Sequence, residues 1–132
     1  MVFVDTNYFL RFLLDDVDAQ HQEAKRLFVD AAQGRIKLFT SVVVFFEIYW
    51  VLHSVYGKQK DELKEVLESV LQMRWVKFQH GELLKEAVTR LSELNYDLED
   101  AFNLVYAQGK GAEEFKTFDV KVGRKFTRAG DN

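Results

Sequence analysis

The chain has 132 residues, of which 48% are hydrophobic, and its 21 acidic and 18 basic side chains give a net charge of -3 at pH 7. This size and composition predict a single domain over residues 1–132. The chain contains no cysteine, which excludes disulfides and thiolate metal sites, and its N-terminus lacks a secretory pattern, so we expect a cytoplasmic protein. The longest apolar run, residues 42–52, is short and is interrupted by Glu47, so no membrane partner is expected.

The first elements are a strand followed by two helices. "VFV", residues 2–4, predicts a short buried strand, and Asp5 comes directly after it, as either a helix cap or a ligand. "NYFLRFLL", residues 7–14, predicts a short helix. "AQHQEAKRLFVDAA", residues 19–32, predicts a longer helix, because its apolar residues recur at helical spacing until Gly34 stops it.

The middle of the chain contains an ambiguous apolar segment. "RIKLF", residues 35–39, predicts a strand. In "SVVVFFEIYWVLHSVYG", residues 41–57, valines and aromatics favour a strand, but the segment far exceeds the usual strand length of about five or six residues. We therefore predict a helix, which Ser41 caps at its start and Gly57 at its end.

The second half continues the alternation. Apolar spacing and composition predict, in order, a helix at 60–73, a strand at 75–78, helices at 82–94 and 97–109, and a fourth short strand at 115–118. The strands are apolar without polar alternation, which is typical of strands buried on both faces. The sequence therefore predicts an α/β protein with a parallel sheet covered by helices on both faces.

Three acids have positions that suggest a shared site. In open parallel sheets the functional crevice lies beyond the carboxyl ends of the strands. Asp5 and Asp119 each follow a predicted strand, so their carboxylates face one crevice if those strands are neighbours. Glu47 has only apolar neighbours three and four positions away on its helix, which predicts apolar surroundings, unless it lies at the exposed edge of the helix.

Asp100 is a fourth candidate, with a strong structural alternative. "DLED" fits a capping pattern in which Asp97 is the N-cap and Asp100 lies three residues on. Taken alone, Asp100 is better explained as a cap partner. Its occurrence with three other acids at element ends or among apolar residues favours a ligand, and Asp97 is the less favoured of the two.

The donor set indicates a hard cation. Carboxylate oxygens suit Mg²⁺ or Mn²⁺, whereas zinc prefers histidine or cysteine. The three histidines, His21, His53 and His80, have no ligand spacing and are expected to be surface or packing residues. The chemistry that remains is metal-assisted hydrolysis.

Four motifs together resemble a known family. "VFVDTN", the lone glutamate of "SVVVFFEIYWVL", "DLEDAFNLVYA" and "FKTFDVKVGRKF" occur in this order and resemble a PIN domain, more narrowly the VapC-type toxins of toxin–antitoxin pairs. The resemblance covers nearly the whole chain. It implies a Rossmann-like parallel sheet of about five short strands flanked by helices on both faces, an acidic Mg²⁺ or Mn²⁺ site and endoribonuclease activity. The implied partners are an RNA substrate, a small antitoxin protein and a second copy in a homodimer.

The resemblance also assigns roles to individual residues. Those that match the family's acid quartet are Asp5, Glu47, Asp100 and Asp119. Thr6 and Asn7 match its hydroxyl and amide supports, and the nearby Lys121 and Arg124 are expected to hold phosphates. The chain departs from the family pattern in its short end after Asp119, where the last edge strand is expected. The implied reaction is hydrolysis of an RNA phosphodiester by metal-activated water.

Two other functions compete with this hypothesis. A catalytically silent PIN-fold protein would bind a partner without cleaving RNA, and the presence of all four acids argues against it. A phosphoacceptor receiver domain is also a small parallel α/β unit with clustered acids. Receivers begin with paired acids near the first strand, whereas "VDTN" supplies a single one.

Overall fold

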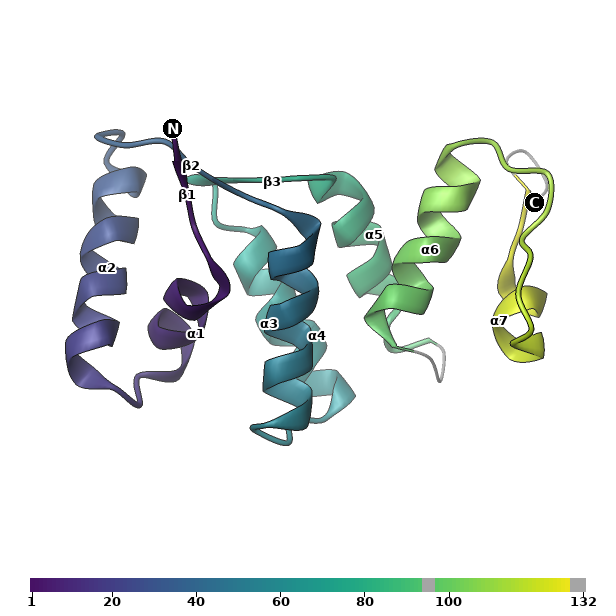
Figure 1. Cartoon of the computed structure of the whole chain (residues 1–132), viewed down its shortest axis with the longest axis horizontal. Helices are drawn as coiled ribbons and strands as arrows, with labels where there is room; N and C mark the ends of the chain where they lie inside the picture. The colour runs from purple at the N-terminus through teal and green to yellow at the C-terminus, as the bar shows by residue number, and fades with distance from the viewer. Residues whose placement is uncertain (94–96, 129–132) are drawn as a thin grey trace. The chain divides into compact units, whose positions relative to one another are not determined.

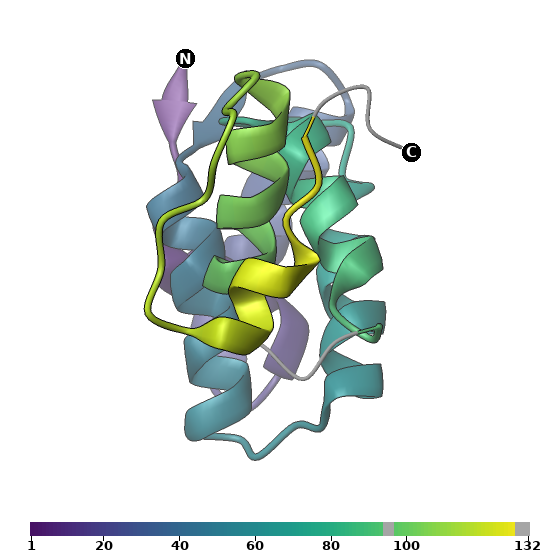
Figure 2. The same ribbon diagram turned by 90° about the vertical axis from the view of Figure 1, so that its right-hand side faces the viewer.

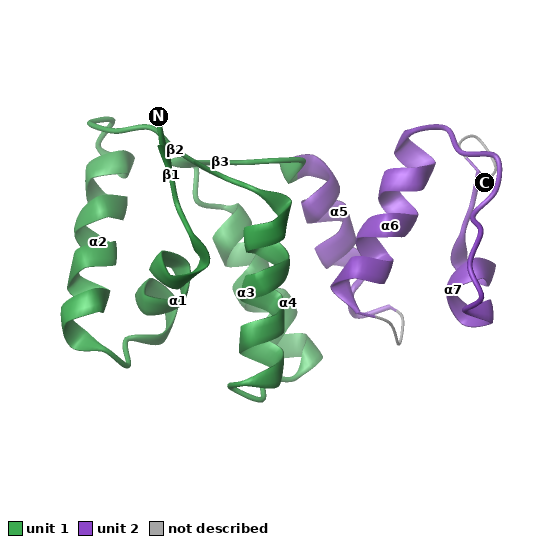
Figure 3. Cartoon of the chain, in the orientation of Figure 1, with its two compact units in different colours: residues 1–81 green, residues 82–132 purple. Residues whose placement is uncertain are grey.

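The computed structural model describes residues 1–93 and 97–128 (Figure 1). The chain forms two compact units, Met1–Gly81 (unit 1) and Glu82–Asn132 (unit 2), which Figure 3 shows in different colours. The single domain over residues 1–132 stays a prediction. None of the helices in the described ranges has the length and apolar character needed to cross a bilayer.

Unit 1 contains a parallel sheet. Its strands are β1 (Val2–Phe3), β2 (Leu38–Thr40) and β3 (Val76–Phe78), in the spatial order β1-β2-β3. Both neighbouring pairs are parallel, with Val2 opposite Leu38 and Leu38 opposite Val76. Parallel strands cannot be joined by a tight turn, so each connection has to cross over through helices.

Four helices make these crossovers and flank the sheet (Figure 1). The connection from β1 to β2 consists of α1 (Thr6–Leu14) and α2 (Asp18–Ala32). The connection from β2 to β3 consists of α3 (Val42–Ser54) and α4 (Lys60–Leu71). Ser41 caps α3 as predicted, because its side chain accepts a hydrogen bond from the Val44 amide.

An aromatic cluster holds α1 in place within unit 1. Phe9 is fully buried on α1, and its ring centroid lies 5.5 Å from that of Phe28 on α2 and 6.0 Å from that of Phe78 on β3. The ring of the equally buried Phe45 on α3 lies 6.2 Å from Phe78 in an edge-to-face arrangement. Such contacts add to the free energy of burial, so the start of α1 is fixed relative to α3.

Unit 2 is helical in its described part. It contains α5, which begins at the boundary residue (Gly81–Arg90), α6 (Leu98–Gly109) and the short α7 (Val120–Lys125). The segment after α6 runs antiparallel to that helix before α7 begins (Figures 1 and 2). Phe115 in this segment stacks on Phe126, which directly follows α7, with ring centroids 5.7 Å apart. This contact holds the segment against the end of α7.

The structure confirms a parallel α/β sheet flanked by helices but corrects its size. We predicted about five strands, whereas the described residues contain three. The predicted strand at 115–118 was wrong, because this segment is irregular. Aromatic and β-branched residues favour a strand only when a neighbouring strand is available, and here Phe118 is fully exposed. The end of the helix predicted at 82–94 lies partly outside the described residues.

Candidate functional site

Asp5 follows β1 and occupies the N-cap position of α1, but it does not cap the helix. Its backbone is extended, with φ -84° and ψ 167°, and its side chain accepts no hydrogen bond from the first turn. The side chain is exposed and makes no hydrogen bond to any residue in the described ranges. Of the two alternatives for this acid, a structural cap is therefore not supported, and both carboxylate oxygens are available to a ligand.

The end of β1 is anchored immediately before Asp5. The Val4 amide donates to the Phe39 carbonyl at 3.0 Å, and the buried Thr40 hydroxyl donates to the Val4 carbonyl at 2.7 Å. Thr40 thus holds the backbone that carries the Asp5 carboxylate. We did not predict this role from sequence, and the available signal was a hydroxyl residue at the end of a strand just before the Ser41 cap.

Thr6 and Glu47 connect α1 to α3 beside Asp5. The Thr6 hydroxyl, only 3% exposed, donates to Glu47 Oε2 at 2.7 Å, which fixes the orientation of the carboxylate. Glu47 Oε1 has no hydrogen-bond partner among the described residues. Of the two alternatives predicted for Glu47, the structure shows the exposed edge of the helix, because the glutamate is exposed, as are its apolar neighbours Val43 and Trp50. Asp5, Thr6 and Glu47 form what we call the unit 1 half-site.

Asp100 lies in a crowded acidic environment in unit 2. Asp97 is the N-cap of α6, and its Oδ1 accepts a hydrogen bond from the Asp100 amide at 3.0 Å, as the capping pattern predicted. Burial raises the pKa of the Asp100 carboxyl above its usual value, and the negative charges of Asp97 and Asp119 raise this pKa further. A bound cation would relieve this repulsion, so the environment of Asp100 suits a metal ligand.

Asp119 lies at the N-cap of α7 instead of at the end of a strand. Its Oδ1 accepts from the Val122 amide at 3.1 Å, and its own amide donates to the Thr117 hydroxyl at 3.0 Å. A Cβ atom at Gly123 would come within 3.3 Å of the Thr117 methyl group, so this turn is closely packed. Asp119 Oδ2 makes no hydrogen bond within the described part of the chain. Asp97, Asp100 and Asp119 form what we call the unit 2 half-site.

The predicted supporting residues lie on the same elements as the acids. Asn7 is exposed in the first turn of α1, directly after Thr6. Lys121 and Arg124 are exposed on α7, one turn apart, within five residues of Asp119. Their positions are compatible with phosphate contacts near the unit 2 half-site.

The donor chemistry fits Mg²⁺ or Mn²⁺. Asp5, Glu47 and Asp119 each keep at least one carboxylate oxygen that no described residue bonds, and such oxygens are the ligands that these ions prefer. In contrast, His21 and His53 hydrogen-bond backbone carbonyls through Nδ1, at 3.0 and 3.3 Å. Among residues 1–93 and 97–128, no three His, Cys, Asp or Glu side chains are grouped closely enough to hold a metal ion by themselves. Neither half-site is therefore a complete ligand set.

The sheet and its acids define an α/β protein with a carboxylate at the end of its first parallel strand. The family model of the PIN domain matches residues 2–128, and the chain therefore belongs to the PIN domain family. This confirms the resemblance seen in the four motifs.

A curated relative covers the same length. The chain is similar to the VapC ribonuclease of Aquifex aeolicus (strain VF5), with 25% identity over 130 residues, which are 98% of this chain and 93% of the relative. No solved structure gave a significant match.

Proposed function

We propose that this protein is a divalent-metal-dependent endoribonuclease and the toxin of a type II toxin–antitoxin pair. The observation that carries the proposal is the uncapped Asp5 carboxylate beside a glutamate oriented by the buried Thr6 hydroxyl. Membership of the PIN domain family and the similarity to a protein named VapC ribonuclease support the same activity. If Asp5 served only as a helix cap, its carboxylate would accept a hydrogen bond from the first turn of α1, and it accepts none.

The proposed ligands come from both half-sites. Asp5, Glu47, Asp100 and Asp119 would share one or two Mg²⁺ or Mn²⁺ ions, with Asp5 as the central ligand. Three of these residues keep an available oxygen, and the fourth, Asp100, has its pKa raised by burial and by neighbouring acids. A bound cation would offset the repulsion between these carboxylates, and this favours its binding.

The chain's own residues position the substrate and the water. A divalent cation, when bound, lowers the pKa of a coordinated water and neutralises charge on the phosphoryl oxygens. Glu47 is fixed through Oε2 by Thr6, so its Oε1 is free to hold or orient the attacking water. Lys121 and Arg124 would contact the phosphates on either side of the cut. Such contacts position the RNA backbone but do not depend on the base sequence.

The test of this function is metal-dependent cleavage. We expect the purified chain to cut single-stranded RNA in millimolar Mg²⁺ or Mn²⁺ and to lose its activity in EDTA, because the bound cation is what lowers the pKa of the attacking water and neutralises charge on the phosphate. Cleavage is followed on a fluorescent RNA pool by gel electrophoresis. Full cleavage in metal-free buffer would reject the metal mechanism, and absence of cleavage with either metal would favour the silent binding module.

Divalent metal should also stabilise the fold. At a concentration of about 100 Kd a ligand that binds only the folded state adds about 2.7 kcal/mol to the free energy of unfolding, so we expect the melting temperature to rise by several degrees with Mn²⁺. In Asp5→Asn the metal-free melting temperature should be higher than that of the parent, because one repelling charge is gone, while most of the metal-induced rise should disappear.

The Asp5→Ala variant separates this expectation from a capping role. Asn can cap a helix and Ala cannot, so a cap would make Asp5→Ala less stable than the parent. Because the Asp5 side chain makes no cap hydrogen bond, we expect little metal-free loss in Asp5→Ala. A lower metal-free melting temperature in Asp5→Ala, with neither protein responding to millimolar Mn²⁺, would count against the metal site.

The biological setting follows from the same proposal. We propose that the chain acts in the cytoplasm as a homodimer on an RNA substrate and is inhibited by a small antitoxin protein. The similarity to a protein named VapC ribonuclease supports the RNA substrate and the antitoxin.

A further inference from the structure

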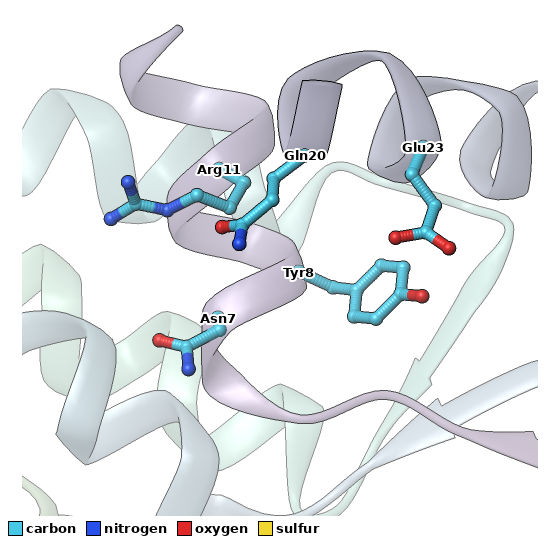
Figure 4. Close-up of a pocket in the computed structure, with 5 residues that line it drawn as sticks. All are labelled: Asn7, Tyr8, Arg11, Gln20 and Glu23. Carbon is cyan, nitrogen blue, oxygen red and sulfur yellow. The ribbon is translucent and has the colours of Figure 1, made fainter. Parts of the chain in front are cut away.

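Unit 1 contains a hollow between α1 and α2 that the proposed catalytic chemistry does not use. It has a volume of about 200 Å³ and is lined by Asn7, Tyr8, Arg11, Gln20 and Glu23 (Figure 4). A protein cavity of about 150 Å³ is large enough for a benzene molecule. The hollow can therefore hold one planar ring system.

The walls offer stacking and hydrogen bonding at the same time. In Figure 4 the Tyr8 ring and the Glu23 carboxylate project into the same space, and the Gln20 amide lies beside the Arg11 side chain. The polar groups of Tyr8, Gln20 and Glu23 make no hydrogen bond to other residues in the described ranges. Their donors and acceptors are thus available to a ligand.

The charge of the hollow selects against a phosphate. The Arg11 guanidinium is engaged elsewhere, because Nη1 donates to Asp16 Oδ1 at 2.7 Å and Nη2 to the Tyr56 hydroxyl at 3.4 Å. Figure 4 shows the Arg11 guanidinium directed away from Glu23. The free charge in the wall is therefore the Glu23 carboxylate, which repels anions and accepts hydrogen bonds from N–H donors.

The hollow adjoins the unit 1 half-site along α1. Asn7 and Tyr8 follow Asp5 and Thr6 directly in the chain, and Thr6 bonds Glu47. A group in the hollow would therefore belong to a nucleotide close to the phosphate that is cut, rather than to a distant part of the RNA.

We propose that this hollow is a nucleobase subsite, an inference that rests on the proposed ribonuclease function. A base next to the cut stacks on Tyr8, as unpaired bases do on aromatic side chains in sequence-specific RNA recognition. Its exocyclic amino group donates to Glu23, a pairing of the kind carboxylates make with cytosine. Gln20 completes the contact through its amide. A base read through its exocyclic amino group can be adenine, cytosine or guanine, whereas uracil has no such group, so we expect uracil to be the least favoured base at this position.

The experiment compares variants on a matched set of RNAs. Each substrate is a short fluorescent single-stranded RNA with A, C, G or U at one position near the cut. For Tyr8→Ala we expect kcat/KM on the preferred substrate to fall about 5- to 150-fold, mainly through KM, which is the range of base stacking energies. Tyr8→Phe keeps the ring and should retain activity. For Glu23→Gln we expect the preference for amino-bearing bases over uracil to weaken, because a neutral amide oxygen is a poorer acceptor than a carboxylate.

Two control variants match these changes in position and charge. Gln22→Ala alters the residue next to Glu23 on α2, but this side chain lines a different hollow with Lys25 and Arg26. Glu68→Gln removes an exposed carboxylate on α4. Both should cleave all four RNAs as the parent does. Circular dichroism and melting curves confirm that every variant is folded.

Binding of the same RNAs to the Asp5→Asn protein, measured by fluorescence anisotropy, separates the inference from the proposed function. If the parent cleaves RNA but adding Tyr8→Ala or Glu23→Gln changes neither cleavage nor binding, the subsite is wrong and the ribonuclease stands. If nothing is cleaved yet base-dependent binding is lost in these variants, the function is wrong and the subsite stands. Unchanged RNA binding with weaker antitoxin binding would assign the hollow to the protein partner and overturn the inference.

Discussion

We expect Asp5→Asn to cleave RNA about a thousandfold more slowly than the parent while its circular dichroism spectrum stays the same. A metal site supplies several kcal/mol of transition-state stabilisation, and each 1.36 kcal/mol corresponds to a factor of ten. The substitution removes the charge of the proposed central ligand and barely changes its shape. Because Asp5 caps nothing through its side chain, the fold should tolerate the change. Initial rates on a fluorescent RNA in saturating Mn²⁺ measure the effect.

Thr6→Val gives a graded comparison at the same half-site. Valine has the shape of threonine but cannot donate to Glu47, and loss of a residue that orients a metal ligand costs about 10- to 100-fold in activity or metal affinity. Thr89→Val is the matched control, since the Thr89 hydroxyl donates to the Lys85 carbonyl of its own helix, α5. Wild-type rates in Asp5→Asn, or equal losses in the two threonine variants, would contradict the assigned roles.

We expect expression of this chain alone to arrest the growth of a bacterial host and co-expression of its antitoxin to restore growth. Each ribonuclease molecule cleaves many RNA molecules in succession, so a few active molecules suffice to deplete an essential RNA. The measurement is optical density after induction, with the amount of protein checked by immunoblotting. The Asp5→Asn variant, expressed at the same level, should be harmless.

The outcome of this growth experiment separates two parts of the proposal. Normal growth at high levels of a protein that cleaves RNA in vitro would reject the toxin role and leave the nuclease standing. Growth arrest by both the parent and Asp5→Asn would show that toxicity arises from something other than cleavage.

Local patterns in the sequence predicted most of the helices and three of the strands. Ser41 and Asp97 act as N-caps because capping depends on a side chain and the amides two or three residues on, which lie close in sequence. The segment at 41–57 was identified as a helix by its length, although α3 ends at Ser54, before Gly57. The strand predicted at 115–118 failed because a strand needs a partner that no local pattern can provide.

The features of the candidate site also divide into those that the sequence determines and those that depend on tertiary packing. The sequence by itself determined the family and supplied the four acids as candidate ligands of a hard cation, because motifs and donor types are properties of the residues. Only the tertiary structure decided that Asp5 caps nothing, that Glu47 is exposed and held by Thr6, and that Thr40 anchors Val4. These contacts join residues 36 to 41 positions apart, and their hydrogen bonds form only once packing brings α1, β1, β2 and α3 together.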